Sequence, residues 1–214
     1  MFVLGIDPGL TRCGYGVVSR TGRRLRAEAA GVVRTSPETD LAYRLAELQE
    51  EVGALIREYR PDHVAIERVL FQVNVRTAMQ TGQASGVVMA EAAAAGCVVA
   101  LYSPNEVKSA VAGWGGADKD QVEQMARSQL GITTPLRPVD AADAVAVALC
   151  HLAMLPPERG PGRSVREALA RTSGRSGVLP WRASPCARDW SLLRRPANGC
   201  RSPPRRRCGV GRAG

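Results

Sequence analysis

Four acidic residues stand at positions where an acid is costly. Asp7 ends one predicted buried strand, and Glu67 ends another. Asp140 and Asp143 are three residues apart, so they share one face of a predicted helix whose other positions are nearly all Ala, Val and Leu. If the two strand ends and this helix face meet, four negative charges occupy one small site.

Such a site has a specific chemistry. Like charges at close range cannot all stay ionised without compensation. No lysine or arginine adjoins Asp140 or Asp143 on the helix, so we expect a metal cation to compensate them. A site of oxygen ligands without His or Cys favours Mg²⁺, with Mn²⁺ as a substitute. Two such ions about 3.5–4 Å apart clamp the attacking and leaving oxygens in phosphodiester hydrolysis. We therefore expect two Mg²⁺ ions per subunit.

Each acid also has a simpler interpretation. Asp7, which precedes Pro8 and Gly9, could only begin a turn. Asp140 could only cap the helix, and Glu67 could be a surface acid at a strand end. Asp143 lies inside an otherwise apolar helix and is the hardest to explain without a function. The four together favour a catalytic site more strongly than any one of them does.

The elements that would position these acids follow from the apolar periodicity of residues 1–157. Strands are expected at 2–6, 14–19, 24–35, 63–67 and 98–102, and helices at 41–59, 75–95, from 104, 119–130 and 140–155. Strands first, then strands alternating with helices, predict an α/β domain around a mixed sheet. The helix at 75–95 is rich in small residues and could pack against the sheet or against a second subunit.

Composition changes after Pro157. The net charge is +9, but residues 1–158 contain three more acids than bases, whereas residues 159–214 contain 14 Arg and two acids. Gly, Pro, Ser and Arg dominate there, so we expect the segment 158–214 to be a mostly disordered tail. A basic tail suits nucleic acid electrostatically, but it could equally be only solvated.

Other features narrow the class of protein. No signal peptide and no stretch of about 18 uninterrupted apolar residues is present, so we expect a soluble cytoplasmic protein with no membrane association. The six cysteines are scattered without a zinc or redox spacing, which favours plain thiols. The chain has 27 Arg and only two Lys, Lys108 and Lys119. These two could be retained for their compact ammonium groups, or by chance.

Several motifs carry a family resemblance. They are G-I-D-P-G-L-T at 5–11, G-Y-G at 14–16, A-I-E-R-V at 65–69, the stretch 74–86 with its G-Q-A core, G-W-G-G-A-D-K-D-Q-V at 113–122 and D-A-A-D-A at 140–144. In order and spacing they resemble the RuvC family of Holliday-junction resolvases, and the resemblance runs from residue 1 to about 157.

The resemblance implies a ribonuclease-H-like fold, a homodimer, and a DNA endonuclease that makes paired symmetric nicks in four-way junctions during recombination and repair. It also implies cooperation with a branch-migration helicase. The family's catalytic, metal-binding acids fall on Asp7, Glu67, Asp140 and Asp143.

The same resemblance implies DNA contacts, with one departure from the family pattern. The family usually has an aromatic residue three positions after the glutamate, for use against the bases at the crossover. Leu70 stands there in this chain, and Phe71 follows it, so either side chain could fill the role. The candidate DNA-contacting residues are Lys108, Lys119, Leu70, Phe71 and Arg76.

Two other functions compete with this one. An actin-like or sugar-kinase-type ATPase also opens with a strand, an Asp and a Gly, but its fold needs a second such half, and no second strand-turn of this type is present. A DNA-binding module without catalysis would need only the basic tail, and four acids at strand ends and in an apolar helix would then be wasteful. Nicking of a four-way junction with Mg²⁺, compared with ATP hydrolysis, distinguishes the three.

Overall fold

The structure is a computed structural model that describes residues 1–69 and 75–156. The strands are β1 (Phe2–Asp7), β2 (Arg12–Thr21), β3 (Arg24–Arg34), β4 (His63–Glu67) and β5 (Val98–Tyr102). The helices are α1 (Leu41–Tyr59), α2 (Val75–Ala94), α3 (Pro104–Ala112), α4 (Lys119–Leu130) and α5 (Val139–Met154).

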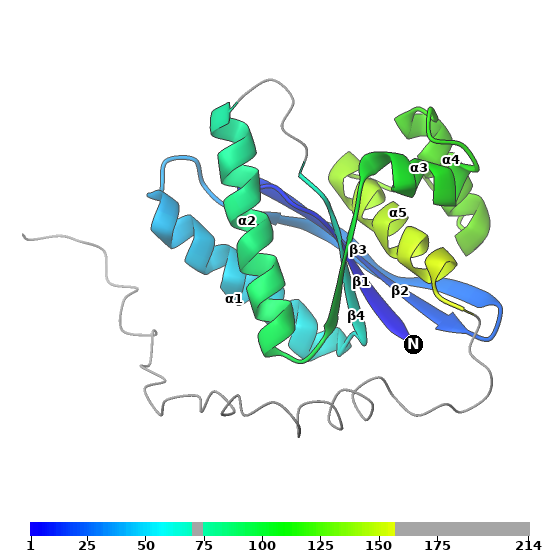
Figure 1. The fold of residues 1–214 in the computed structure, drawn as a ribbon, viewed down its shortest axis with the longest axis horizontal. Coiled ribbons are helices and arrows are strands. Elements are labelled where there is room, and N and C mark those ends of the chain that lie inside the picture. Colours follow the sequence, from blue (N-terminus) through cyan, green and yellow to red (C-terminus); the bar gives the residue numbers. More distant parts are fainter. Residues whose placement is uncertain (70–74, 157–214) are drawn as a thin grey trace, which may run out of the picture. The chain divides into compact units, whose positions relative to one another are not determined.

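The strands form one mixed sheet in the order β3-β2-β1-β4-β5 (Figure 1). β1, β2 and β3 are antiparallel neighbours, and β4 and β5 add to the β1 edge in parallel. Parallel neighbours need crossover connections, which α1 and α2 supply before β4 and β5. The carboxyl ends of β1, β4 and β5 therefore lie at the same end of the sheet.

Helices cover both faces of this sheet. α1 and α2 pack on one face, and α5, flanked by α3 and α4, packs on the other (Figure 1). The side chains of β1 alternate between these two layers, as the pleat of a strand requires. Val3 belongs to the core beneath α5, whereas Leu4 and Ile6 belong to the core beneath α1 and α2.

Glycines allow α5 to lie unusually close to the strands. A Cβ at Gly5 would overlap the carbonyl oxygen of Ala144, and one at Gly16 would lie 2.6 Å from a methyl carbon of Val145. Gly5 and Gly16 are register partners on β1 and β2, so the two gaps adjoin. A Cβ at Gly14 would likewise overlap the backbone oxygen of Asp140. The first half of α5 thus rests directly on the backbone of the sheet.

A buried polar chain fixes the second half of α5. The hydroxyl of Tyr102 lies 2.8 Å from Nδ1 of His151, and Nε2 of that ring lies 2.9 Å from Nδ1 of His63. Burial, His63 and Arg20 lower the pKa of His151 to about 4. Burial also lowers the pKa of His63. Both rings are therefore neutral at pH 7, and the chain joins α5 to β4 and β5 without a buried charge.

The predicted α/β fold with a mixed sheet and flanking helices is confirmed. The predicted helix at 41–59 has the bounds of α1, and Arg60, in a left-handed conformation before Pro61, ends it. The largest error concerns β2, which is longer at both ends than the predicted 14–19. Within the described residues, no helix is long and apolar enough to cross a membrane. The tail 158–214 lies outside the described residues.

We expect Gly5→Ala to lower the free energy of unfolding by about 1–3 kcal/mol, the usual cost of overpacking a close contact. The added methyl would have to displace the backbone of α5, because the atoms that it meets are the oxygen of Ala144 and the nitrogen of Ala148. Chemical denaturation monitored by circular dichroism measures this loss. Gly53→Ala in α1 is the matched control, since a Cβ there would meet only the ends of the flexible Glu91 and Arg57 side chains. Alanine in that helix should be neutral or stabilising. Equal stability of the two variants would contradict the close approach of α5.

Candidate active site

Two of the predicted acids lie side by side at the carboxyl ends of parallel strands. β1 and β4 pair in the register Gly5 with Ala65 and Ile6 with Ile66. The next step in this register brings Asp7 beside Glu67. Because side chains alternate along a strand, both acids lie on the face that α5 covers, as Gly5 and Ala65 do.

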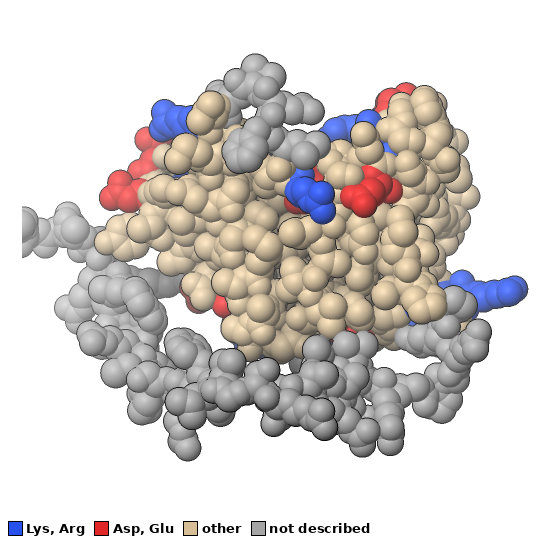
Figure 2. All heavy atoms as spheres, in the orientation of Figure 1, with Lys and Arg blue, Asp and Glu red and all other residues tan. Residues whose placement is uncertain are grey.

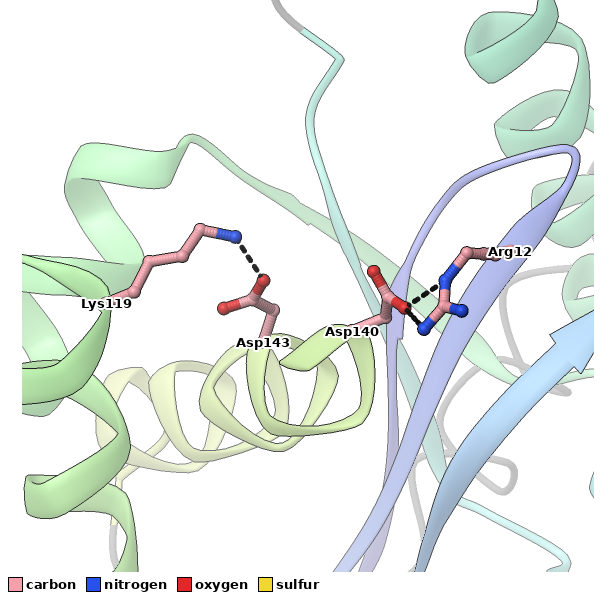
Figure 3. Close-up of polar contacts among 4 residues, drawn as sticks. All are labelled: Arg12, Lys119, Asp140 and Asp143. Atoms are coloured by element: carbon pink, nitrogen blue, oxygen red, sulfur yellow. Dashed lines mark hydrogen bonds and ion pairs between the residues drawn. The ribbon is translucent and has the colours of Figure 1, made fainter. Parts of the chain in front are cut away.

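The other two acids come from the first turns of α5, above this strand end. Asp140 and Asp143 are three positions apart in the sequence and project from the start of the helix (Figure 3). The helix begins after Pro138, which is its N-cap residue. The interpretation of Asp140 as an N-cap is therefore wrong. Negative side chains are favourable in a first helical turn, where the helix dipole is positive.

Asp7, Glu67 and Asp143 line one open pocket together with Lys108 and Lys119. Its apolar wall comes from α3, α4 and α5 and comprises Pro104, Val107, Val122 and Ala146. Asp140 is not part of this lining, but its charge still acts on Asp7. In Figure 2, few charged side chains lie over the middle of the face, and acidic and basic groups lie close to each other in its upper part. The structure thus places three of the four predicted acids around one pocket, with Asp140 outside its lining.

Two of the four acids have basic partners, which corrects one expectation from the sequence. Nε of Arg12 donates to Oδ2 of Asp140 at 2.7 Å, and Nη2 of Arg12 contacts the same oxygen. Nζ of Lys119 donates to Oδ2 of Asp143 at 2.6 Å. The two pairs lie at the start of α5 (Figure 3). The expectation that no basic side chain compensates these acids is wrong, because the compensating groups come from β2 and α4.

Asp7 and Glu67 are not compensated in this way. Burial raises the pKa of Asp7 to about 7, and the nearby carboxylates of Glu67, Asp143 and Asp140 add to this effect against Lys119. Burial, followed by the charge of Asp143, also raises the pKa of Glu67, while Lys119 and Lys108 oppose the rise. Asp7 and Glu67 are therefore the acids whose negative charge is least compensated by basic side chains.

These residues fit a divalent cation by chemistry. The donors are carboxylate oxygens, which suit Mg²⁺ and Mn²⁺. Burial, followed by the charges of the neighbouring carboxylates, raises the pKa of Asp7 to about 7, so a bound cation would stabilise its charged form. Over residues 1–69 and 75–156, no group of three or more acidic, His or Cys side chains is arranged to hold a metal ion. The carboxyl groups are present, and their side chains would have to turn towards a bound cation.

The candidate DNA-contacting residues are placed unequally. Lys108 is half-buried and lines the pocket, and Lys119 reaches into it from the start of α4. Arg76 is exposed in the first turn of α2. Leu70 and Phe71 lie outside the described residues. The role of Arg12 was not predicted from the sequence, because nothing in its spacing indicates a contact with a residue 128 positions away.

We expect Asp7 to titrate near pH 7 in the metal-free protein. Glu67→Gln should lower the pKa of Asp7, because it removes the neighbouring carboxylate that raises this pKa most. Carboxyl ¹³C NMR during a pH titration in EDTA measures both values. Since metal ligands must be deprotonated, Mg²⁺ affinity should fall as the pH drops below about 7. Glu50→Gln, on the exposed side of α1, is the control and should leave Asp7 unchanged. An Asp7 that titrates near 4 would show that the charges are relieved in some other way.

Comparisons with known proteins identify the family of this chain. The family model described as Crossover junction endodeoxyribonuclease RuvC matches residues 3–151. The chain is 51% identical to the RuvC of Salinispora arenicola over 83% of this chain and 99% of that protein. It is 48% identical to the RuvC of Streptomyces avermitilis over 82% and 99%.

Solved structures give the same answer. Thermus thermophilus RuvC is 38% identical with a TM-score of 0.68, covering 72% of this chain and 94% of that one. Its complex with a Holliday junction substrate is 39% identical with a TM-score of 0.68, covering 71% and 93%. A yeast mitochondrial Holliday junction resolvase, 16% identical with a TM-score of 0.53 over 71% and 78%, shares the fold. With its ribonuclease-H-like sheet and its converging acids, this chain belongs to the RuvC family of crossover junction endodeoxyribonucleases.

Proposed function

We propose that this protein resolves Holliday junctions by hydrolysing phosphodiester bonds at paired, symmetric positions, with two divalent metal ions per subunit held by Asp7, Glu67, Asp140 and Asp143. The observation that carries the proposal is the placement of Asp7 beside Glu67 at the ends of β1 and β4, under the first turns of α5. The junction complex of the Thermus thermophilus relative supports the choice of substrate.

The acids and the lysines have different roles in this proposal. Asp7 and Glu67, on the sheet, are the fixed ligands, because their strands are buried and paired on both sides. Asp140 and Asp143, on α5, complete the set from above. When bound, the metal ions would activate the attacking water and stabilise the leaving oxygen. The two lysines that line the pocket add positive charge where a phosphate would approach.

In this proposal DNA binding depends on basic side chains rather than on the four acids. We propose that Lys108, Lys119 and Arg76 contact the phosphate backbone, which positions the junction without reading its sequence. Leu70 and Phe71 remain the candidates for contact with the crossover bases. The Arg-rich segment 158–214 would add salt-sensitive affinity that is not selective for junctions. A branch-migration helicase remains the expected partner in recombination and repair.

We expect Asp7→Asn, Glu67→Gln, Asp140→Asn and Asp143→Asn each to reduce junction cleavage at least about 100-fold. Each change keeps the shape of the side chain and removes a charge that the metal requires. Junction affinity should change little, because binding depends mainly on cationic groups. Cleavage of a labelled synthetic junction on a denaturing gel measures the rate and locates both nicks, and a gel-shift assay measures affinity.

Glu50→Gln is the matched control for these variants, because Glu50 is exposed on α1 and lines no part of the pocket. Its cleavage rate should equal that of the wild type. Near-normal cleavage by Asp7→Asn or Glu67→Gln would remove the acid cluster from the mechanism. Nicks at unrelated positions in the two strands would refute paired, symmetric cutting.

Removal of metal should stop the reaction completely. We expect no cleavage in excess EDTA and full recovery with Mg²⁺ or Mn²⁺. Ca²⁺ should support junction binding but little cleavage, because its larger and looser coordination does not hold octahedral geometry. The cleavage assay with each ion measures this order. Undiminished cleavage in EDTA would contradict a metal mechanism.

The proposed enzyme is a homodimer, since symmetric cutting of two equivalent strands needs two active sites related by a twofold axis. α2 is the candidate interface, because its small residues allow close packing, and Val75 and Met79 on it expose large apolar side chains. We expect sedimentation to show a dimer at micromolar concentration, and Met79→Glu to shift it towards monomer. An active monomer at that concentration would contradict the dimer.

A further inference from the structure

Arg12 stands at the first position of β2, directly after the turn that follows Asp7. Two of its nitrogens, Nε and Nη2, contact one carboxylate oxygen, Oδ2 of Asp140. The Arg12 side chain is 41% exposed and that of Asp140 is 28% exposed. The pair therefore lies at the rim of the site, where ions from solvent can reach it.

The position of this contact matters because Asp140 is one of the acids proposed to hold metal. A guanidinium is always protonated, so Arg12 cannot release the oxygen by losing a proton. It repels an approaching divalent cation and occupies the oxygen that the cation would take. Arg12 and a metal ion are thus alternative partners of the same carboxylate.

We propose that Arg12 is a positioning residue that neutralises Asp140 in the metal-free enzyme and gives way when a divalent cation binds. Arg12 then sets the metal concentration at which the site fills. This inference rests on the proposed function only in that Asp140 is a metal ligand.

Lys119 makes a comparable contact with Asp143, but it differs in one respect. Its side chain is 70% exposed and offers a single ammonium nitrogen to Oδ2. It also lines the pocket, where we place it in contact with phosphate. Arg12 is absent from that lining, so its substitution tests metal loading more cleanly.

Titration of the metal-free full chain with Mn²⁺, without DNA, tests the inference when free Mn²⁺ is counted by electron paramagnetic resonance. We expect Arg12→Gln to lower the Mn²⁺ Kd roughly two- to fivefold, the range typical of losing a competing exposed ion pair. Arg12→Lys should fall between wild type and Arg12→Gln, because lysine keeps the charge but not the double contact.

Arg26→Gln is the matched control. It removes the same charge from an exposed arginine on β3 that pairs with Glu28 at 3.6 Å. Its Mn²⁺ Kd should stay within twofold of the wild type. An Arg12→Gln protein that binds Mn²⁺ no more tightly than Arg26→Gln overturns the inference, as does one that binds it more weakly.

Asp140→Asn separates failure of this inference from failure of the proposed metal site. If Asp140→Asn weakens Mn²⁺ binding but Arg12→Gln does not strengthen it, Asp140 is a ligand and Arg12 does not compete with the metal. If neither change affects Mn²⁺ binding, Asp140 is not a ligand, and both proposals fail.

A spectroscopic measurement on the wild type reports on the contact between Arg12 and Asp140 itself. The Nε–H resonance of Arg12, assigned by its loss in Arg12→Lys, should move when Mg²⁺ is added. In Asp140→Asn the resonance should lie near the Mg²⁺-bound position before any metal is present. A resonance that does not respond to saturating Mg²⁺ overturns the inference.

Discussion

The close approach of α5 to the backbone of β1 and β2 is the constraint on which the candidate site depends. The side-chain-free faces of Gly5, Gly14 and Gly16 let the helix backbone occupy space that a Cβ would fill. This contact brings Asp140 and Asp143 near the two strand-end acids. A helix held away by ordinary side chains would leave the four acids on two separate surfaces, without the burial and the neighbouring charges that together raise the pKa of Asp7 to about 7.

Four acids close together repel one another, and basic side chains compensate two of them more than the other two. The two acids on α5 are exposed enough to pair with Arg12 and Lys119. Asp7 and Glu67 are held by the sheet, so their raised pKa values reflect burial before anything else. The site thus combines two acids on the sheet, whose pKa values are raised, with two acids on α5 that have partly exposed basic partners. In our proposal, metal binding relieves the first pair and replaces a partner in the second.

Much of this arrangement could be predicted from local patterns in the sequence. Apolar periodicity and Pro61 located α1, and the buried acids at strand ends stood out because such positions are costly for a charge. The pairing of Arg12 with Asp140 could not be predicted, because it joins residues 128 positions apart and depends on how α5 lies on β2. The role of Gly5 and Gly16 was hidden for the same reason. A glycine in a strand indicates close approach by something, but not by which helix.

The carboxyl end of α5 is fixed by its own set of polar contacts, separate from those of the two acids at its amino end. Arg20, which is buried, donates to the carbonyl oxygens of Leu152 at 2.8 Å and Pro156 at 3.1 Å. A cation there complements the negative end of the helix dipole, as Asp140 in the first turn complements its positive end. The neutral chain from Tyr102 through His151 to His63 fixes the same end to β4 and β5. These contacts hold the helix at its carboxyl end, away from the acids at its amino end. In our proposal the site accepts metal ions and then a phosphate, which would require both a fixed backbone and exchangeable side-chain contacts, and α5 would supply them at opposite ends.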